Sequence, residues 1–224
     1  MATVTIKSYL APSKSDKIIL FGLMRNFSCA VRFAYQMLVD GENPNDARKK
    51  LCAMYDLNSR YASDAVFRAE QVLRLLRTNG NGNDVNFSSA LYSRGNRRAK
   101  GNLNLRFLCC EDGNLVLRVN ISKRKWLYIP VVCVAKMDGS NRWDGFNWQL
   151  QRAKAIGEWF PYSVGLKMVH DMILCYVNVD EEYAPKDISL VRQQTFVEYF
   201  VCKTHRHEDY EIHEIEEQSE PLVV

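Results

Sequence analysis

The sequence predicts an α+β fold in which helices interrupt an antiparallel β-barrel. Three observations lead to this class. The segment Thr3 to Leu10 alternates and is rich in β-branched residues, as expected for a strand. From Ser15 to Arg77 apolar residues recur at helical spacing. After the glycine- and asparagine-rich run Thr78 to Asp84, the period changes from helical to alternating, which indicates a return to strands.

The helical part divides at recognisable start and stop signals. Ser13 or Ser15 can cap the first helix and Gly41 can end it, while Asn43 precedes a proline at the first position of the second helix. The three expected helices run from Ser15 to Val39, from Pro44 to Met54 and from about Ser59 to Arg77.

The second half of the chain is expected to form strands. Glu111-Asp112-Gly113 is a hairpin signal between the first two, and His170-Asp171 joins the last two. The stretch Arg142 to Trp159 is tryptophan-rich and fits either an amphipathic helix or a long loop. The expected strands are Leu103 to Cys109, Asn114 to Ile121, Trp126 to Val134, Tyr162 to Val169 and Met172 to Val179.

Charge is distributed unevenly along the chain. The net charge of the 224 residues is +4, but Asp180 to Val224 holds twelve acidic and four basic residues. The preceding part, Met1 to Val179, holds 26 basic and 14 acidic residues. A basic body attracts phosphate, and each Lys or Arg that neutralises a phosphate releases counterions. Charge alone is equally compatible with a solvated surface.

Composition excludes several other classes. Hydrophobic residues are 47% of the chain and charged residues 25%, the balance of a folded globule. The longest apolar run, Ile129 to Ala135, is too short to span a bilayer, and the first twenty residues lack a secretory pattern. Seven cysteines without a CxxC pair suggest free thiols in a reducing compartment. We therefore expect a cytoplasmic protein without a membrane partner.

Two basic clusters interleaved with aromatic residues are the main candidate site. Guanidinium groups and backbone amides freed by glycine suit phosphate oxygens, and aromatic rings offer surfaces for stacking bases. Between Asn83 and Tyr128 there are nine basic and three acidic residues. Nucleic-acid binding is therefore preferred over a merely soluble loop. The candidate residues are Tyr92, Arg94, Arg97, Arg98, Lys100, Arg106, Lys123, Arg124, Lys125 and Trp126, with Arg68 on the third helix.

Catalytic and metal signals are weak in comparison. The acids that follow the last strand form a run, which is typical of a solvated segment, whereas a two-metal nuclease needs carboxylates from several elements. Cys202, His205, His207 and His213 form a loose cluster whose spacing matches no standard structural zinc site. No phosphate-binding glycine loop or nucleophile elbow is present. We expect no cofactor and no activity as an enzyme from this chain alone.

The order of these segments resembles a known family. TVTIKSYLAPSKSDK and RNFSCAVRFAYQML resemble the opening strand, proline turn and following helix of TnpB (OrfB) proteins, transposon-encoded relatives of type V CRISPR effectors. YDLNSRYASDAVFRAEQVLRLL resembles the family's next recognition helix. LYSRGNRRAKGNLNLRF, NLVLRVNISKRKWLYIPV and PYSVGLKMVHDMILCYVNVDEEYAP resemble segments of its barrel. The resemblance covers about residues 2 to 185.

This resemblance implies an architecture and partners. It implies an OB-like (wedge) barrel formed by residues 1–12 and 85–185, a helical recognition insertion at 13–84, and an acidic tail at 186–224, either helical or disordered. In the family these two domains hold a guide RNA and double-stranded DNA, and read a short motif beside the target. By position, Arg60, Tyr61 and Asp64 match helix residues that approach this motif, and Lys7 lies on a strand near RNA. A prokaryotic or phage origin is also implied.

The resemblance stops where the family's nuclease begins. There the family continues into a RuvC-type domain with a catalytic aspartate in a "GIDlG" strand, whereas this chain reads KDISLVRQQTFVEYF and then turns acidic. The zinc-ribbon CxxC pairs are also missing. Three hypotheses follow: a nucleic-acid-binding lobe that does not cleave, half of a split endonuclease completed by a separate RuvC-type subunit, or an interaction module whose acidic tail is autoinhibitory.

Overall fold

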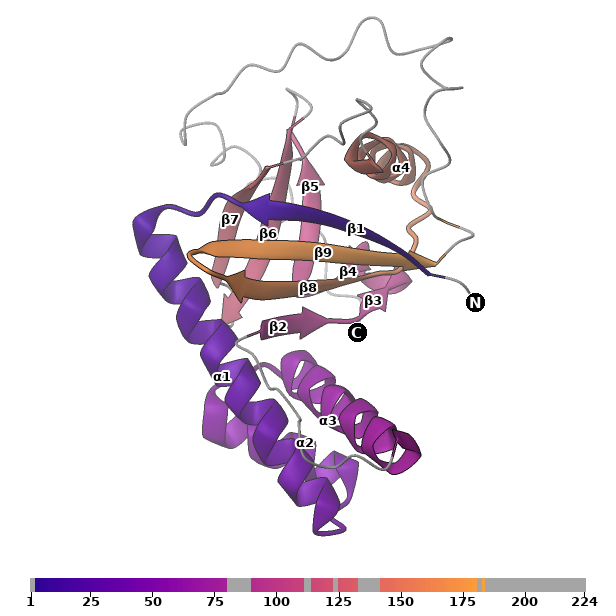
Figure 1. The fold of residues 1–224 in the computed structure, drawn as a ribbon. Coiled ribbons are helices and arrows are strands. Elements are labelled where there is room, and N and C mark those ends of the chain that lie inside the picture. The colour runs from indigo at the N-terminus through magenta and orange to yellow at the C-terminus, as the bar shows by residue number, and fades with distance from the viewer. Residues whose placement is uncertain are drawn as a thin grey trace, which may run out of the picture.

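The structure, a computed structural model, describes residues 3–79, 90–110, 114–122, 125–132, 142–180 and 183 of the chain. Its backbone follows the α+β class expected from the sequence, with a helical segment between the first strand and the others (Figure 1). The elements are β1 (Thr3–Leu10), α1 (Lys14–Val39), α2 (Pro44–Tyr55), α3 (Ser59–Asn79), β2 (Ala90–Ser93), β3 (Gly95–Asn96), the 3-10 helix η1 (Arg97–Ala99), β4 (Gly101–Asn102), β5 (Leu105–Cys109), β6 (Leu115–Ser122), β7 (Lys125–Val132), α4 (Arg142–Ile156), β8 (Tyr162–Val169) and β9 (Met172–Asp180).

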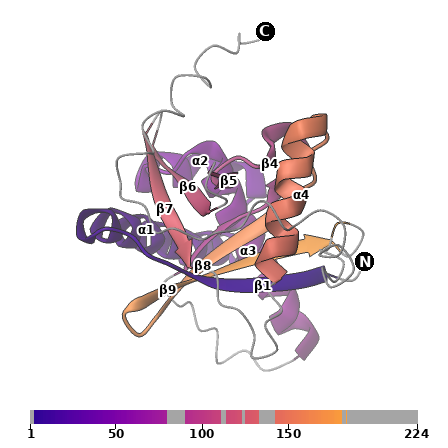
Figure 2. The same ribbon diagram turned by 90° about the horizontal axis from the view of Figure 1, so that it is seen from above.

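The strands form one curled, antiparallel sheet. Its order is β2-β8-β9-β1-β7-β6-β5, and β3 and β4 form a separate two-stranded ribbon. Strand β1 pairs with β9 along its whole length, whereas among the described residues it pairs with β7 only at Tyr9 and Leu10. The sheet therefore bends sharply between β1 and β7, and its two halves face each other in the shape of a half-barrel (Figures 1 and 2).

Helices α1, α2 and α3 pack together below the sheet (Figure 1). Ser13 caps α1, because its Oγ accepts a hydrogen bond of 3.1 Å from the Asp16 amide. Asn43 caps α2 in the same way, with Pro44 at the first helical position, and Gly41 ends α1 with a φ of 84°. The expected caps, proline and glycine are therefore confirmed.

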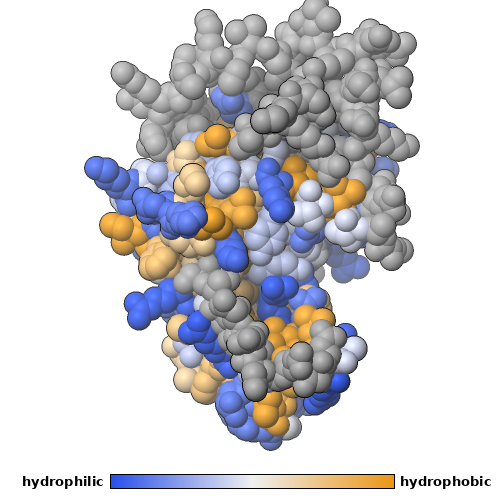
Figure 3. Space-filling view, viewed as in Figure 1, coloured by the Kyte–Doolittle hydropathy of each residue, from blue (hydrophilic) through white to orange (hydrophobic). Residues whose placement is uncertain are grey.

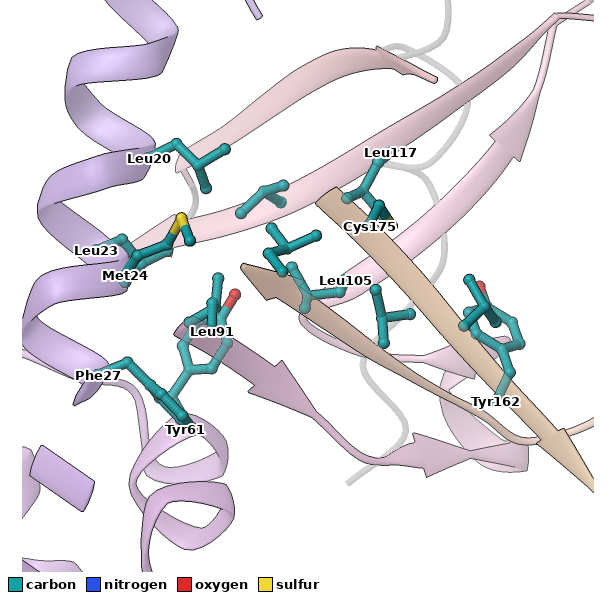
Figure 4. Close-up of a cluster of buried hydrophobic side chains, with 14 of the residues drawn as sticks. Leu20, Leu23, Met24, Phe27, Tyr61, Leu91, Leu105, Leu117, Tyr162 and Cys175 are labelled. Carbon is teal, nitrogen blue, oxygen red and sulfur yellow. The ribbon is translucent and has the colours of Figure 1, made fainter. Parts of the chain in front are cut away.

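The core fills the space between the two halves of the sheet and extends to the helices. Figure 4 shows side chains from helices and strands meeting there. Helix α1 alone contributes nine buried residues. Among the buried side chains drawn together are Leu20, Leu23, Met24, Phe27, Tyr61, Leu91, Leu105, Leu117, Tyr162 and Cys175.

Helix α1 is the one described helix that is long and apolar enough to cross a membrane by length and composition. This is weak evidence for a membrane span, because the core helix of a soluble protein passes the same test. The buried stripe of α1 packs against α3, so its apolar character has an explanation within the fold.

The structure adds one strand and decides one open alternative. Ala90–Ser93 was not among the expected strands, yet it forms the edge strand β2 beside β8. The sequence of the stretch Arg142 to Trp159 fits either a helix or a long loop, and the structure shows a helix, Arg142–Ile156. The turn at 111–113, the run at 80–84 and the acidic tail lie outside the described residues.

Candidate nucleic-acid interface

The outward face of β2, β8, β9 and β1 is polar and aromatic, whereas the inward face of the same strands is apolar. Successive side chains of a strand point to opposite faces, so one set enters the core and the other faces solvent. On β1, Ile6, Ser8 and Leu10 are buried while Thr5 and Lys7 are exposed. These four strands lie in front of β5–β7 in Figure 1, and Figure 3 shows their side of the molecule in the same view.

One row of residues crosses this outward face. Tyr92 on β2 is the Cα partner of Gly165 on β8, Gly165 of Tyr176 on β9, and Tyr176 of Lys7 on β1. Directly opposed residues share a face, so these side chains belong to one surface. The row therefore presents two aromatic rings and one ammonium group beside each other.

Gly165 gives the row its shape. A Cβ atom at this position would lie 2.1 Å from ring atoms of Tyr176, so the ring occupies the space that a side chain would need. Glycine in a strand commonly marks such a close approach. As a result the Tyr176 ring extends across β8 toward the β2 side, where Tyr92 lies.

Three cations surround these rings. The Arg68 guanidinium, from α3, lies 5.1 Å from the ring centroid of Tyr92, within the range of a cation–π contact. Lys7 and Lys167 are exposed on β1 and β8. In the part of the chain that the structure describes, none of the three has a carboxylate within salt-bridge distance. We call the residues Lys7, Tyr9, Arg68, Tyr92, Lys167 and Tyr176 the platform.

The platform is free of acidic side chains in its three central rows. The row on one side of Tyr176 holds Ser163, Asn178 and Thr5, and the row on the other holds Ala90, Lys167, Leu174 and Tyr9. Burial raises the pKa of Tyr176, and the charge of Arg68 opposes this only in part. The phenol is therefore uncharged at neutral pH, which suits stacking beside an anionic backbone.

An ion pair fixes the edge of the platform. The Asp64 carboxylate is fully buried, and its Oδ1 accepts a hydrogen bond of 2.6 Å from Nε of Arg94. The Arg94 guanidinium also lies 4.4 Å from the centroid of the Phe67 ring. Asp64 and Arg68 are one turn apart on α3, and Arg94 and Tyr92 are two residues apart in β2. The ion pair therefore fixes α3 relative to β2, and this places the Arg68 guanidinium over the Tyr92 ring.

The sequence-based candidates fall into different environments. Lys7, Arg68 and Tyr92 come together on the platform. Tyr61, Asp64 and Arg106 are 1%, 0% and 7% exposed, so direct contact with a ligand is not open to these side chains in this structure. Arg94 is committed to Asp64, and Arg60 is half-buried on α3.

The basic residues after β2 form a second group. Asn96 caps η1, which displays Arg97 and Arg98, and Lys100 follows with a φ of 50°. Arg97 and Arg98 are exposed. Arg106 holds this segment from beneath through long hydrogen bonds to the carbonyl oxygens of Asn102 and Ala99, each 3.4 Å.

The remaining candidates are separate from the platform. Lys125 is exposed at the start of β7, and Trp126 is half-buried with the Arg118 guanidinium 4.2 Å from its ring centroid. Lys123, Arg124 and the zinc candidates Cys202, His205, His207 and His213 lie outside the described residues. Within the described residues no group of three or more His, Cys, Asp or Glu side chains could hold a metal.

Tyr9, Lys167 and Tyr176 were missed in the sequence. The alternation of side chains along β8 and β9 can be seen in the sequence. It places Tyr176 on the opposite face from its apolar neighbours Cys175 and Val177. Its position opposite Gly165 and Tyr92 depends on strand register, which the separate segments do not reveal.

With this geometry established, comparison with known proteins identifies the family. The family model described as SSO2105 N-terminal domain matches residues 3–193. The chain belongs to this family. The match spans every described helix and strand, so the SSO2105 N-terminal domain includes both the half-barrel sheet and the helices between β1 and β2. A search of curated proteins finds no match.

Proposed function

We propose that this SSO2105 N-terminal domain binds single-stranded nucleic acid on its platform, with RNA as the physiological ligand. The observation that carries the proposal is the row formed by Tyr92, Gly165, Tyr176 and Lys7. It places two tyrosine rings on a solvent-facing sheet, and the cations around them have no acidic partner among the described residues.

The chemistry of a single strand fits this surface. Unstacked bases can lie on tyrosine rings, and each such contact is worth about 1–3 kcal/mol. Phosphate oxygens can then reach Lys7, Arg68 and Lys167 at the sides of the rings. A duplex keeps its bases stacked inside, so it could use the cations but not the rings.

The larger proposal is that the chain corresponds to the RNA- and DNA-binding lobe of a TnpB-like protein. Support comes from the quoted segments and from the insertion of α1–α3 between two strands of one sheet. The half-barrel then corresponds to the OB-like wedge domain and α1–α3 to the recognition domain. Guide-like RNA, double-stranded DNA with an adjacent motif and a separate RuvC-type nuclease subunit are the proposed partners.

The experiment is a binding titration on the full-length protein. Fluorescently labelled single-stranded RNA, single-stranded DNA and duplex RNA of one sequence are compared by anisotropy at low salt. We expect the single strands to bind more tightly than the duplex, and RNA to co-purify with the protein under gentle conditions. Binding of the duplex alone, or an absorbance spectrum of pure protein together with no measurable RNA affinity, would overturn the proposal.

A further inference from the structure

A second basic and aromatic surface lies apart from the platform. It is an open groove of 610 Å³ between the C-terminal half of α4, η1 and Tyr183. Its wall includes two basic residues, Arg97 and Arg152, one acidic residue, Glu158, and the rings of Trp148 and Trp159. These residues are not part of the platform, although Arg97 lies only four residues beyond the end of β2, the strand that carries Tyr92.

Two guanidinium groups stand at the walls of this groove over aromatic faces. Arg97 lies 5.2 Å from the ring centroid of Tyr183, and Arg152 lies 5.7 Å from that of Trp148. Neither guanidinium has a carboxylate within salt-bridge distance among the described residues. A guanidinium stacked on a ring keeps its N–H edge available for a bidentate bond to a carboxylate. The groove therefore suits a peptide that carries both carboxylates and apolar side chains.

The chain itself contains such a peptide. Residues 208–220 read EDYEIHEIEEQSE, with seven acidic residues and neither Lys nor Arg. Tyr210, Ile212 and Ile215 supply apolar groups within it. This acidic segment is connected to Tyr183, a wall of the groove, by the 24 residues 184–207.

We propose that the acidic segment 208–220 docks in this groove and thereby competes with nucleic acid for the basic η1 segment. The connection makes docking an intramolecular event. The 24 residues of this connection span at most about 80 Å when fully extended, so their length lets the segment reach the groove. Because the contact forms within one chain, its population does not depend on protein concentration. The part of the proposal that concerns competition rests on the proposed function, whereas docking does not.

Docking is tested without nucleic acid. A benzophenone photocrosslinking residue replaces Ile212 in the full-length protein, and crosslinked peptides are identified by mass spectrometry. We expect crosslinks within one chain to peptides from 148–160, and their loss when Arg152→Glu is added. Lys49→Glu on α2 is the matched charge reversal and should leave them unchanged. Crosslinks elsewhere, between two chains, or insensitive to Arg152→Glu would overturn docking.

Competition is tested by neutralising the acidic segment in the full-length protein. Glu211→Gln, Glu214→Gln, Glu216→Gln and Glu217→Gln are combined, and RNA affinity is measured at low and high salt. We expect a gain of about fivefold or more at low salt that disappears at high salt, since the interaction is electrostatic. Equal RNA affinity of the two proteins would overturn competition while leaving the proposed function intact. If neither protein binds RNA, the proposed function fails and competition fails with it, whereas docking is still decided by the crosslinks.

Discussion

Two glycines leave room for tyrosine rings because they have no side chain. Gly165 and Gly101 both lie against tyrosine rings, but their circumstances differ. At Gly165 a Cβ would meet the outer end of the Tyr176 ring, on the solvent-facing side of the sheet. At Gly101 it would meet the ring of the buried Tyr162, and φ is +92°. The two glycines therefore serve different purposes, one for the surface and one for the core.

Alanine substitutions should separate these two purposes. Gly165→Ala is expected to change the free energy of unfolding by about 1 kcal/mol or less, because the Tyr176 ring can swing away. Gly101→Ala should cost about 3 kcal/mol, since backbone strain adds to a clash with a ring that cannot move. Urea unfolding measures both. A Gly165→Ala protein as unstable as Gly101→Ala would show that the Tyr176 ring is fixed.

The Asp64–Arg94 pair should make stability depend on pH. Burial raises the pKa of Asp64 above 3.8, and Arg94 lowers it again in part. An acid with a raised folded-state pKa binds more protons when folded, so its contribution to the free energy of unfolding falls as pH rises from about 3.8 through the folded pKa. Arg94→Gln removes the charge that lowers the pKa of Asp64. The folded-state pKa then rises, and the pH range over which stability falls extends to higher pH.

We therefore predict that the cost of Arg94→Gln grows with pH. At pH 7.5 it should be about 2 kcal/mol, because Arg94 is partly exposed and the buried carboxylate loses its partner. At pH 4 the cost should be clearly smaller. Urea titrations at both pH values measure the difference, and Asp64→Asn in the same background should remove it. A cost that is equal at both pH values would contradict a buried, ionised Asp64.

At the scale of elements, α4 occupies the place where the sheet bends. Among the described residues β1 pairs with β7 only at Tyr9 and Leu10, so the carbonyl of Lys7 lies outside this pairing. The Trp143 indole N–H donates a hydrogen bond of 2.8 Å to this oxygen. Trp143 also packs against Phe107 and Phe146, with centroids 5.4 and 5.6 Å away. The helix therefore satisfies a backbone group that the bend leaves open.

The same substitution at two positions of α4 tests this role. Trp143→Phe should lower the free energy of unfolding by about 2–3 kcal/mol, because it removes buried contacts and leaves a buried carbonyl unpaired. Trp148→Phe, on the exposed side of the helix, should cost under about 0.5 kcal/mol. Thermal or urea unfolding measures the free energy of unfolding of both variants. Equal costs for the two substitutions would show that α4 is only loosely attached to the sheet.

Local signals predicted the helices and paired strands well. Helical periodicity, Ser13, Asn43 and Gly41 each act within a few residues, so the sequence reveals their effect directly. Strand β2 was missed because four residues beside a basic segment carry little alternation. The candidate site was predicted only in part, since pairing Tyr92 with Tyr176 requires the registers of three strands.

For the whole molecule, the uneven distribution of charge predicts how RNA affinity depends on salt concentration. For a single strand, each Lys or Arg that neutralises a phosphate contributes about 0.7 to the slope of log affinity against log salt concentration. Lys7→Ala and Lys167→Ala should therefore each reduce the slope for RNA binding by about 0.7. Lys49→Ala, an exposed lysine on α2, is the control and should leave it unchanged. Slopes that are insensitive to the platform lysines would place RNA elsewhere on the basic surface.

In the proposed function, stacking of bases on the platform distinguishes this molecule from a merely basic protein. The decisive measurement compares the affinity of the full-length protein and of its Tyr92→Ala, Tyr176→Ala double variant for single-stranded RNA of about 12 nucleotides. The loss should be at least tenfold, with Tyr92→Phe and Tyr176→Phe close to wild type and unfolding curves showing that all variants are folded. A folded double variant that binds RNA as tightly as wild type would contradict binding on the platform.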